Sequence, residues 1–78
     1  MKFLKYKANP EIIAVVSDNG KTLCIIGQVS DLLKMNLIYE DNTSGNFDKW
    51  LLIDRFGRCV EFDSKKDAKV AARLKFGA

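Results

Sequence analysis

Cysteine and charged side chains are the groups through which this chain could do chemistry. Cys24 and Cys59 lie far apart in the sequence, and the chain contains no histidine. Catalysis by a Ser–His or Cys–His pair is therefore excluded, and two separated thiols supply too few ligands for a zinc site. The sequence also has no glycine-rich phosphate loop and no carboxylate pair placed in a recognisable cleft. We therefore expect neither an enzyme nor a cofactor or metal site, and we expect both thiols to be buried apolar groups.

Basic side chains near the C-terminus form the first candidate binding group. They share one arc of a helix predicted between Ser64 and Gly77: Lys65, Lys66, Lys69 and Arg73. Such a stripe can lie along a nucleic-acid backbone, or it can be the solvated outer face of a helix. Few aromatic residues are interleaved with it, which favours the solvated face. Nucleic-acid binding through this helix is therefore the alternative function.

A large aromatic residue at a predicted turn tip is the second candidate. Phe56 stands between Arg55 and Gly57, and an arginine beside an aromatic ring is typical of an interaction hot spot. Phe56 could equally fold back onto the sheet. Basic and aromatic residues also occur in the opening segment. The expected protein-binding residues are Lys5, Tyr6, Lys7, Arg55, Phe56 and Arg58.

A β-hairpin over residues 11–27 is the clearest element. Its Asn19-Gly20 pair predicts a two-residue type I′ turn, which would place Val16 opposite Leu23 and Val15 opposite Cys24. Both faces of this hairpin are apolar up to the turn, although a small domain normally leaves one sheet face to solvent. Each face must therefore be covered, either by other parts of the chain or by a second copy in a homodimer.

A second hairpin is predicted over residues 49–63. Its turn at 54–57 suits a type I turn with Gly57 in the left-handed region and a bulge. This register pairs Trp50 with Phe62 and Leu52 with Val60, which gives a strong core face. An earlier strand is expected in the opening segment "KFLKYK".

Two helices complete the expected elements. The spacing of apolar residues indicates a short helix over residues 31–37, with Ser30 as its N-cap, although 36–40 could instead be a strand. A second helix follows Ser64, and its predicted inward arc contains Val70, Ala71 and Leu74. Alanines at 68, 71 and 72 would allow this helix to approach a sheet closely.

These elements predict an α+β fold: an antiparallel sheet of 4–5 strands, built from two hairpins and packed with a short helix and a C-terminal helix. The chain has 78 residues, of which 47% are hydrophobic, so we expect it to form a single domain over 1–78. It has a net charge of +3 and no apolar run long enough for a signal peptide or a membrane span. An intracellular, cytoplasmic setting with reduced thiols is therefore expected.

Three snippets resemble, in the same order, small phage anti-CRISPR proteins that inhibit a type I CRISPR surveillance complex. They are the opening "MKFLKY", the hairpin "AVVSDNGK", and "FDS" leading into a helix, and together they cover less than a quarter of the chain. The central segment 29–46 and the basic helix have no counterpart in the resemblance. The resemblance implies a phage-encoded inhibitor that occupies a surface of a host protein complex, and Tyr6 is the one position to which it could assign a contact role.

Overall fold

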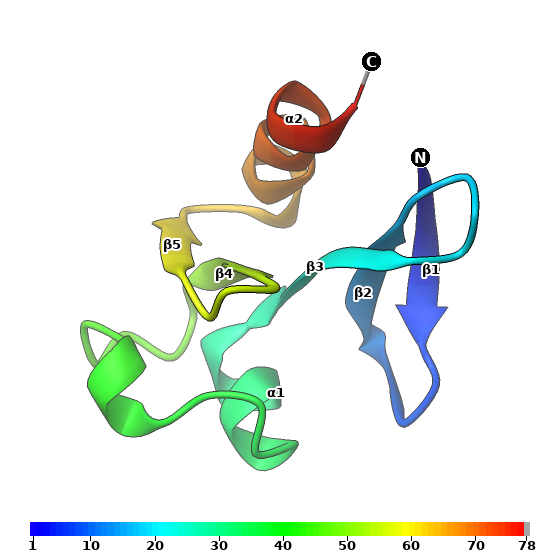
Figure 1. Cartoon of the computed structure of the whole chain (residues 1–78). Coiled ribbons are helices and arrows are strands. Elements are labelled where there is room, and N and C mark those ends of the chain that lie inside the picture. The colour runs from blue at the N-terminus through cyan, green and yellow to red at the C-terminus, as the bar shows by residue number, and fades with distance from the viewer. Residues whose placement is uncertain (78) are drawn as a thin grey trace.

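A computed structural model describes residues 1–77, apart from the side chain of Asn42, and shows an antiparallel meander with two helices (Figure 1). The strands are hydrogen-bonded in the order β1-β2-β3-β4-β5. Their bounds are Lys2–Tyr6 for β1, Asn9–Val16 for β2, Thr22–Gln28 for β3, Trp50–Asp54 for β4 and Cys59–Phe62 for β5. Helix α1 spans Val29–Lys34, a 3₁₀ turn spans Glu40–Asn42, and helix α2 spans Lys65–Phe76. The predicted α+β fold with an antiparallel sheet is confirmed.

Both faces of the β2–β3 hairpin are covered within the chain. On one face Ile13, Val15, Cys24, Ile26 and Leu52 pack with Ala68 and Ala72 of α2. On the other face Ile12 and Leu51 pack with Val29, Leu32 and Ile38, which come from α1 and the segment after it. A homodimer through either face would have to displace one of these elements. The structure therefore favours the intramolecular alternative for covering this hairpin.

The β2–β3 turn differs from the prediction. The Gly20 N–H donates to Ser17 O at 2.9 Å. Within this turn only Gly20 has a positive φ, of 86°, whereas a type I′ turn requires a positive φ at Asn19 as well. Val16 consequently pairs with Thr22 and not with Leu23, across a bulge. The prediction of a type I′ turn was wrong. Ser17 Oγ accepts the Lys21 N–H at 3.1 Å, and such local side-chain bonds favour the longer turn with a glycine bulge.

The second hairpin forms as predicted. Trp50 pairs with Phe62 and Leu52 pairs with Val60. Gly57 has a φ of 84°, which is the left-handed conformation expected for the bulge position of this turn. The register from sequence was correct here because the turn length and the apolar alternation of both strands agree.

Helix α1 begins earlier and is shorter than predicted. Its N-cap position is Gln28, whose side chain makes no capping bond, so the prediction of Ser30 as N-cap was wrong. The Val29 N–H instead donates to Lys49 O at 2.9 Å, so the loop before β4 satisfies the start of the helix. Residues 36–40 form no strand.

Helix α2 begins and ends where the sequence predicts. Ser64 Oγ accepts the Asp67 N–H at 3.1 Å, and Ser64 O accepts the Ala68 N–H at 3.2 Å. At the other end the Gly77 N–H donates to Arg73 O at 2.8 Å. These bonds satisfy backbone groups that the ends of a helix otherwise leave unpaired.

The inward arc predicted for α2 was wrong for Val70 and Leu74, although Ala71 does pack against the core. The helix buries Ala68 and Ala72 against the sheet, whereas Leu74 is 83% exposed and Val70 is 43% exposed. Alanine has no side chain beyond Cβ, so the row 68/72 lets the helix backbone lie close to the strands and gain dispersion contacts over its whole length. Close approach, and not the most hydrophobic arc, determines which face of α2 turns inward. No helix of residues 1–77 is long and apolar enough to cross a membrane.

The buried position of Cys24 predicts a difference in thiol reactivity. The pKa of the Cys24 thiol is raised to about 11, chiefly by burial, which Lys75 partly opposes and Asp54 reinforces. Cys59 is only partly buried, and burial also raises the pKa of its thiol. The thiolate is the reactive form, so we expect a disulfide reagent at neutral pH to modify Cys59 slowly and Cys24 only after unfolding. Mass spectrometry of the wild-type chain and of a Cys59→Ser variant, each labelled with and without urea, measures the two reactivities. Equal labelling of Cys24 in both conditions would contradict the packing of α2 over β3.

Candidate protein-binding site

The turn between β4 and β5 is held by one buried carboxylate. Asp54 is 7% exposed, and its Oδ1 accepts the N–H groups of Phe56 at 2.9 Å and of Arg58 at 3.0 Å. Its Oδ2 accepts from Lys75 Nζ of α2 at 3.3 Å. The bond from the Arg58 N–H is the largest influence and, with those from Phe56 and Lys75, holds the pKa of Asp54 below its ordinary value despite burial. The carboxylate therefore fixes the turn and ties it to the last turn of α2.

Phe56 projects from this turn into solvent. It is 76% exposed, so the alternative in which it folds back onto the sheet was wrong. The Arg55 guanidinium carbon lies 5.2 Å from the centre of the Phe56 ring, within the range of a cation–π contact. An exposed aromatic ring on a hydrogen-bonded turn loses little conformational freedom when a partner covers it. Arg55 and Phe56 together form a suitable anchor for an interface.

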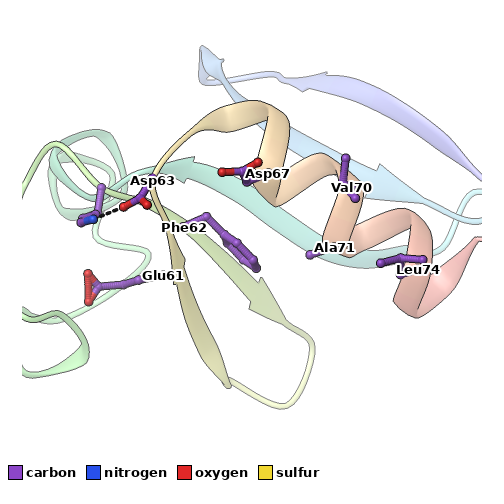
Figure 2. Close-up of a pocket in the computed structure, with 8 residues that line it drawn as sticks. Glu61, Phe62, Asp63, Asp67, Val70, Ala71 and Leu74 are labelled. Atoms are coloured by element: carbon purple, nitrogen blue, oxygen red, sulfur yellow. Dashed lines mark hydrogen bonds and ion pairs between the residues drawn. The ribbon is translucent and has the colours of Figure 1, made fainter.

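A groove lies beside this turn, between α2 and the edge strand β5, and Figure 2 shows it. Its volume is about 410 Å³. We name it the α2–β5 groove, and its lining residues are Lys49, Glu61, Phe62, Asp63, Asp67, Val70, Ala71 and Leu74. In Figure 2 the Phe62 side chain points from β5 toward the helix, and Leu74 stands at the far end of the helix from Asp67. The groove therefore has an apolar centre and an acidic end.

The acidic end of the groove is partly neutralised by local bonds. Lys49 forms an ion pair with Asp63, which lowers the pKa of the Asp63 carboxyl and raises that of the Lys49 ammonium. Ser44 Oγ donates to Glu61 Oε2 at 2.9 Å. Asp67 is exposed on the first turn of α2. Three carboxylates against one ammonium leave this end with a net negative charge, in a chain that is positive overall.

The C-terminal part of α2 links the groove to the β4–β5 turn. Leu74 immediately precedes Lys75, whose ammonium is bonded to the turn carboxylate Asp54. Val60 lies on β5 on the same face as Phe62, and it is about half exposed. β5 is an edge strand, so a strand of another protein could pair with its free side.

The six predicted protein-binding residues do not form a single surface. Residues 55–58 belong to the turn next to the groove, whereas Lys5 and Tyr6 belong to β1 at the opposite edge of the sheet. Four strand spacings separate the two edges, which is about 19 Å. Tyr6 packs against the core that includes Ile12, while Lys5 and Lys7 are exposed. The structure therefore brings Arg55, Phe56 and Arg58 together and leaves the opening segment elsewhere.

The predicted nucleic-acid-binding residues do share one element, α2. They are Lys65, Lys66, Lys69 and Arg73. Lys65 lies over the Trp50 ring, with Nζ 5.7 Å from its centre, and Lys69 and Arg73 both lie over the Phe3 ring. The sequence interleaves few aromatics along the helix, but the sheet supplies these two rings from distant positions.

The groove was not predicted from the sequence because Val70 and Leu74, which line it, were assigned to the face of α2 that packs on the sheet. The alanines Ala68 and Ala72, one helical turn apart and opposite to Val70, were expected to allow close approach to a sheet, and that expectation is the signal that orients the helix correctly. A close-packed alanine row turns Val70 and Leu74 away from the buried contact with the sheet and toward the α2–β5 groove. Comparison of the chain with protein families, curated proteins and solved structures yields no match.

Proposed function

We propose that this chain is a non-enzymatic binding protein that acts by occupying a surface of a protein complex. More specifically, we propose that the chain is a phage-encoded inhibitor of a CRISPR effector and that it works in the cytoplasm of the host cell. The observation that carries the binding function is the α2–β5 groove, with Leu74 almost fully exposed beside it. The resemblance of the opening and hairpin segments to anti-CRISPR proteins supports the choice of complex.

Exposed apolar side chains on α2, on β5 and on the β4–β5 turn support a protein as the partner. Val60, Val70 and Leu74 line or flank the groove, and Phe56 stands on the adjoining turn. Contiguous apolar surface with a polar rim is typical of protein interfaces, whose buried centres are enriched in apolar and aromatic residues. The acidic end of the groove favours a partner segment in which apolar side chains are accompanied by basic ones.

The expected effect of a single substitution follows from this arrangement. We expect Leu74→Ser to weaken partner binding at least about 10-fold, since it removes a central apolar contact while leaving the fold intact. Leu4→Ser is the control because Leu4 is the same residue type and also has an exposed side chain, 50% against 83% for Leu74, on the opposite edge strand. The prediction is checked by measuring the affinity of both variants for a purified type I CRISPR surveillance complex immobilised on a sensor surface. Inhibition of target-DNA binding by the complex is a second readout.

Three outcomes would overturn parts of the proposal. If the wild-type chain did not bind the surveillance complex, the proposal that it inhibits a CRISPR effector would be contradicted. Equal weakening by Leu74→Ser and Leu4→Ser would remove the groove as the site. A wild-type dimer in solution that Leu74→Ser converts to a monomer would show that the groove binds a second copy, which contradicts a foreign partner.

A further inference from the structure

The flank of α2 opposite the groove carries a cluster of cations drawn from two distant segments. Lys65, Lys69 and Arg73 follow one another at four-residue intervals, about 6 Å apart along the helix axis. Strand β1 runs beside this flank and adds Lys5, which lines a hollow of about 200 Å³ together with Lys65 and Lys69. We name these four residues the β1–α2 basic surface.

Phe3 organises one half of this surface. The Lys69 ammonium lies 5.5 Å from the centre of the Phe3 ring, and the Arg73 guanidinium carbon lies 4.9 Å from it. Two cations on one ring are held close together although their charges repel. Phe3 also lines hollows on both sides, one shared with Lys5 and the other with Arg73. The cations therefore sit at fixed positions beside recesses.

The four cations are not neutralised by the parts of the chain that the structure describes. The ion pairs among residues 1–77 join the N-terminus to Asp18, Lys49 to Asp63, and Lys75 to Asp54. None of them includes a residue of the β1–α2 basic surface, and no acidic side chain lines either hollow beside Phe3. Like charges that are grouped without counter-charges raise the local positive potential and attract polyanions.

We propose that the β1–α2 basic surface binds the sugar–phosphate backbone of a nucleic acid. This is a second activity, on the other flank of α2 from the groove, and it does not depend on the proposed protein partner. A regular row of cations fits a polymer with a regular row of charges better than it fits the scattered carboxylates of a protein. Binding is directed at phosphates, so it distinguishes base sequences weakly.

The salt dependence of binding gives a quantitative test. If four phosphates are neutralised, the logarithm of the association constant falls against the logarithm of salt concentration with a slope of about −3.6 for duplex DNA. Affinity should drop about 100-fold between 50 and 200 mM salt. Fluorescence anisotropy of labelled duplex DNA, single-stranded DNA and single-stranded RNA, each titrated with the full chain, measures the slopes. A slope of about −2.8 is expected for the single strands.

Matched charge variants separate this surface from net charge alone. We expect the double variant Lys5→Gln with Lys69→Gln to reduce the duplex slope to about half, since two of the four contacts are lost. Lys21→Gln with Lys34→Gln changes the net charge equally, at an exposed turn and on α1, and should leave the slope unchanged. Circular dichroism of both variants is the control for folding, and both spectra should match that of the wild-type chain.

Several results would overturn the proposal. One is the absence of binding to all three probes at 50 mM salt. Another is an equal reduction of the salt slope in both double variants. A third is a wild-type association constant that does not change with salt concentration. Poly-glutamate that competes with duplex DNA at equal charge concentration would instead identify an acidic protein as the ligand, which also contradicts a nucleic-acid site. Leu74→Ser should bind DNA like the wild-type chain, so a failure of this proposal is distinguishable from a failure of the groove.

Discussion

Replacing Leu32 by alanine is expected to lower the free energy of unfolding by about 2–5 kcal/mol, the range for large-to-small changes in a core. Leu32 is fully buried and, together with Val29, packs α1 against the sheet. α1 has six residues and no side-chain cap, so it cannot persist without packing. Loss of α1 would expose Ile12 and Leu51 on the face that it covers. Urea unfolding followed by circular dichroism measures the change.

Leu74→Ala is the matched control for this prediction. Leu74 is a leucine of the other helix with almost all of its surface in solvent, so its truncation should change the free energy of unfolding by less than about 0.5 kcal/mol. If the two variants were equally stable, α1 would not be packed on the sheet as described. A domain of this size has little stability in reserve, so the Leu32→Ala protein should be partly unfolded near 37 °C.

Gly27 provides an independent check of the same contact. A Cβ at this position would lie 3.0 Å from Leu32 Cδ2 and 3.1 Å from Ile12 Cγ1, which is closer than ordinary contact. Gly27→Ala should therefore destabilise the wild-type chain but cost less in the Leu32→Ala background, where space has been vacated. The coupling in the double-mutant cycle should be about 0.5–3 kcal/mol. Strict additivity would indicate that Leu32 does not cover Gly27.

The residues on each strand face could be predicted from the sequence because the alternation of apolar residues and the length of the turn both restrict the pairing register. In the second hairpin both signals agreed, and the pairing of Trp50 with Phe62 followed. In the first hairpin the Asn-Gly preference pointed to a tighter turn than the one that forms. Ser17 decides the difference through its bond to the Lys21 N–H, a local hydrogen bond that no hydrophobic pattern reveals.

The face of α2 that packs on the sheet could not be predicted from hydropathy. Lys65 and Lys69 lie toward the sheet because their alkyl stems cover apolar surface while their ammonium groups rest over aromatic rings. A hydropathy scale that scores whole residues treats both lysines as polar, so a prediction based on it places them on the solvent side of the helix. Val70 is then assigned to the core although it is 43% exposed and lines the groove.

The candidate sites depend on contacts between segments that are distant in sequence. Phe3 meets Lys69 and Arg73, and Asp54 meets Lys75, only because the meander places β1 on one side of α2 and the β4–β5 turn on the other. Their spacing in the chain carries no trace of these contacts. Single residues such as Phe56 could be identified as candidates from sequence, but their neighbours could not.

Asp54→Asn is expected to flatten the dependence of stability on pH. The hydrogen bonds from the N–H groups of Arg58 and Phe56 and from Lys75 hold the folded-state pKa of Asp54 below its unfolded value, which is about 3.9. A depressed carboxyl pKa stabilises the fold at pH values above the unfolded pKa, and this contribution is lost as the pH falls through the folded pKa. The wild-type chain should therefore be more stable than the variant at pH 7, and the difference should shrink below about pH 4.

Asp63→Asn separates this effect from ordinary surface charge. Lys49 also lowers the pKa of Asp63, but that ion pair lies largely in solvent, where screening leaves such pairs little net value. Urea unfolding between pH 2 and pH 7 should therefore show a wide, pH-dependent gap between wild type and Asp54→Asn and a narrow one for Asp63→Asn. Lys75→Gln removes one of the three partners of Asp54 and should fall between them. If Asp54→Asn were as stable as wild type at pH 7, this carboxylate could not be what fixes the turn, and Phe56 would lose the support on which its role as an anchor depends.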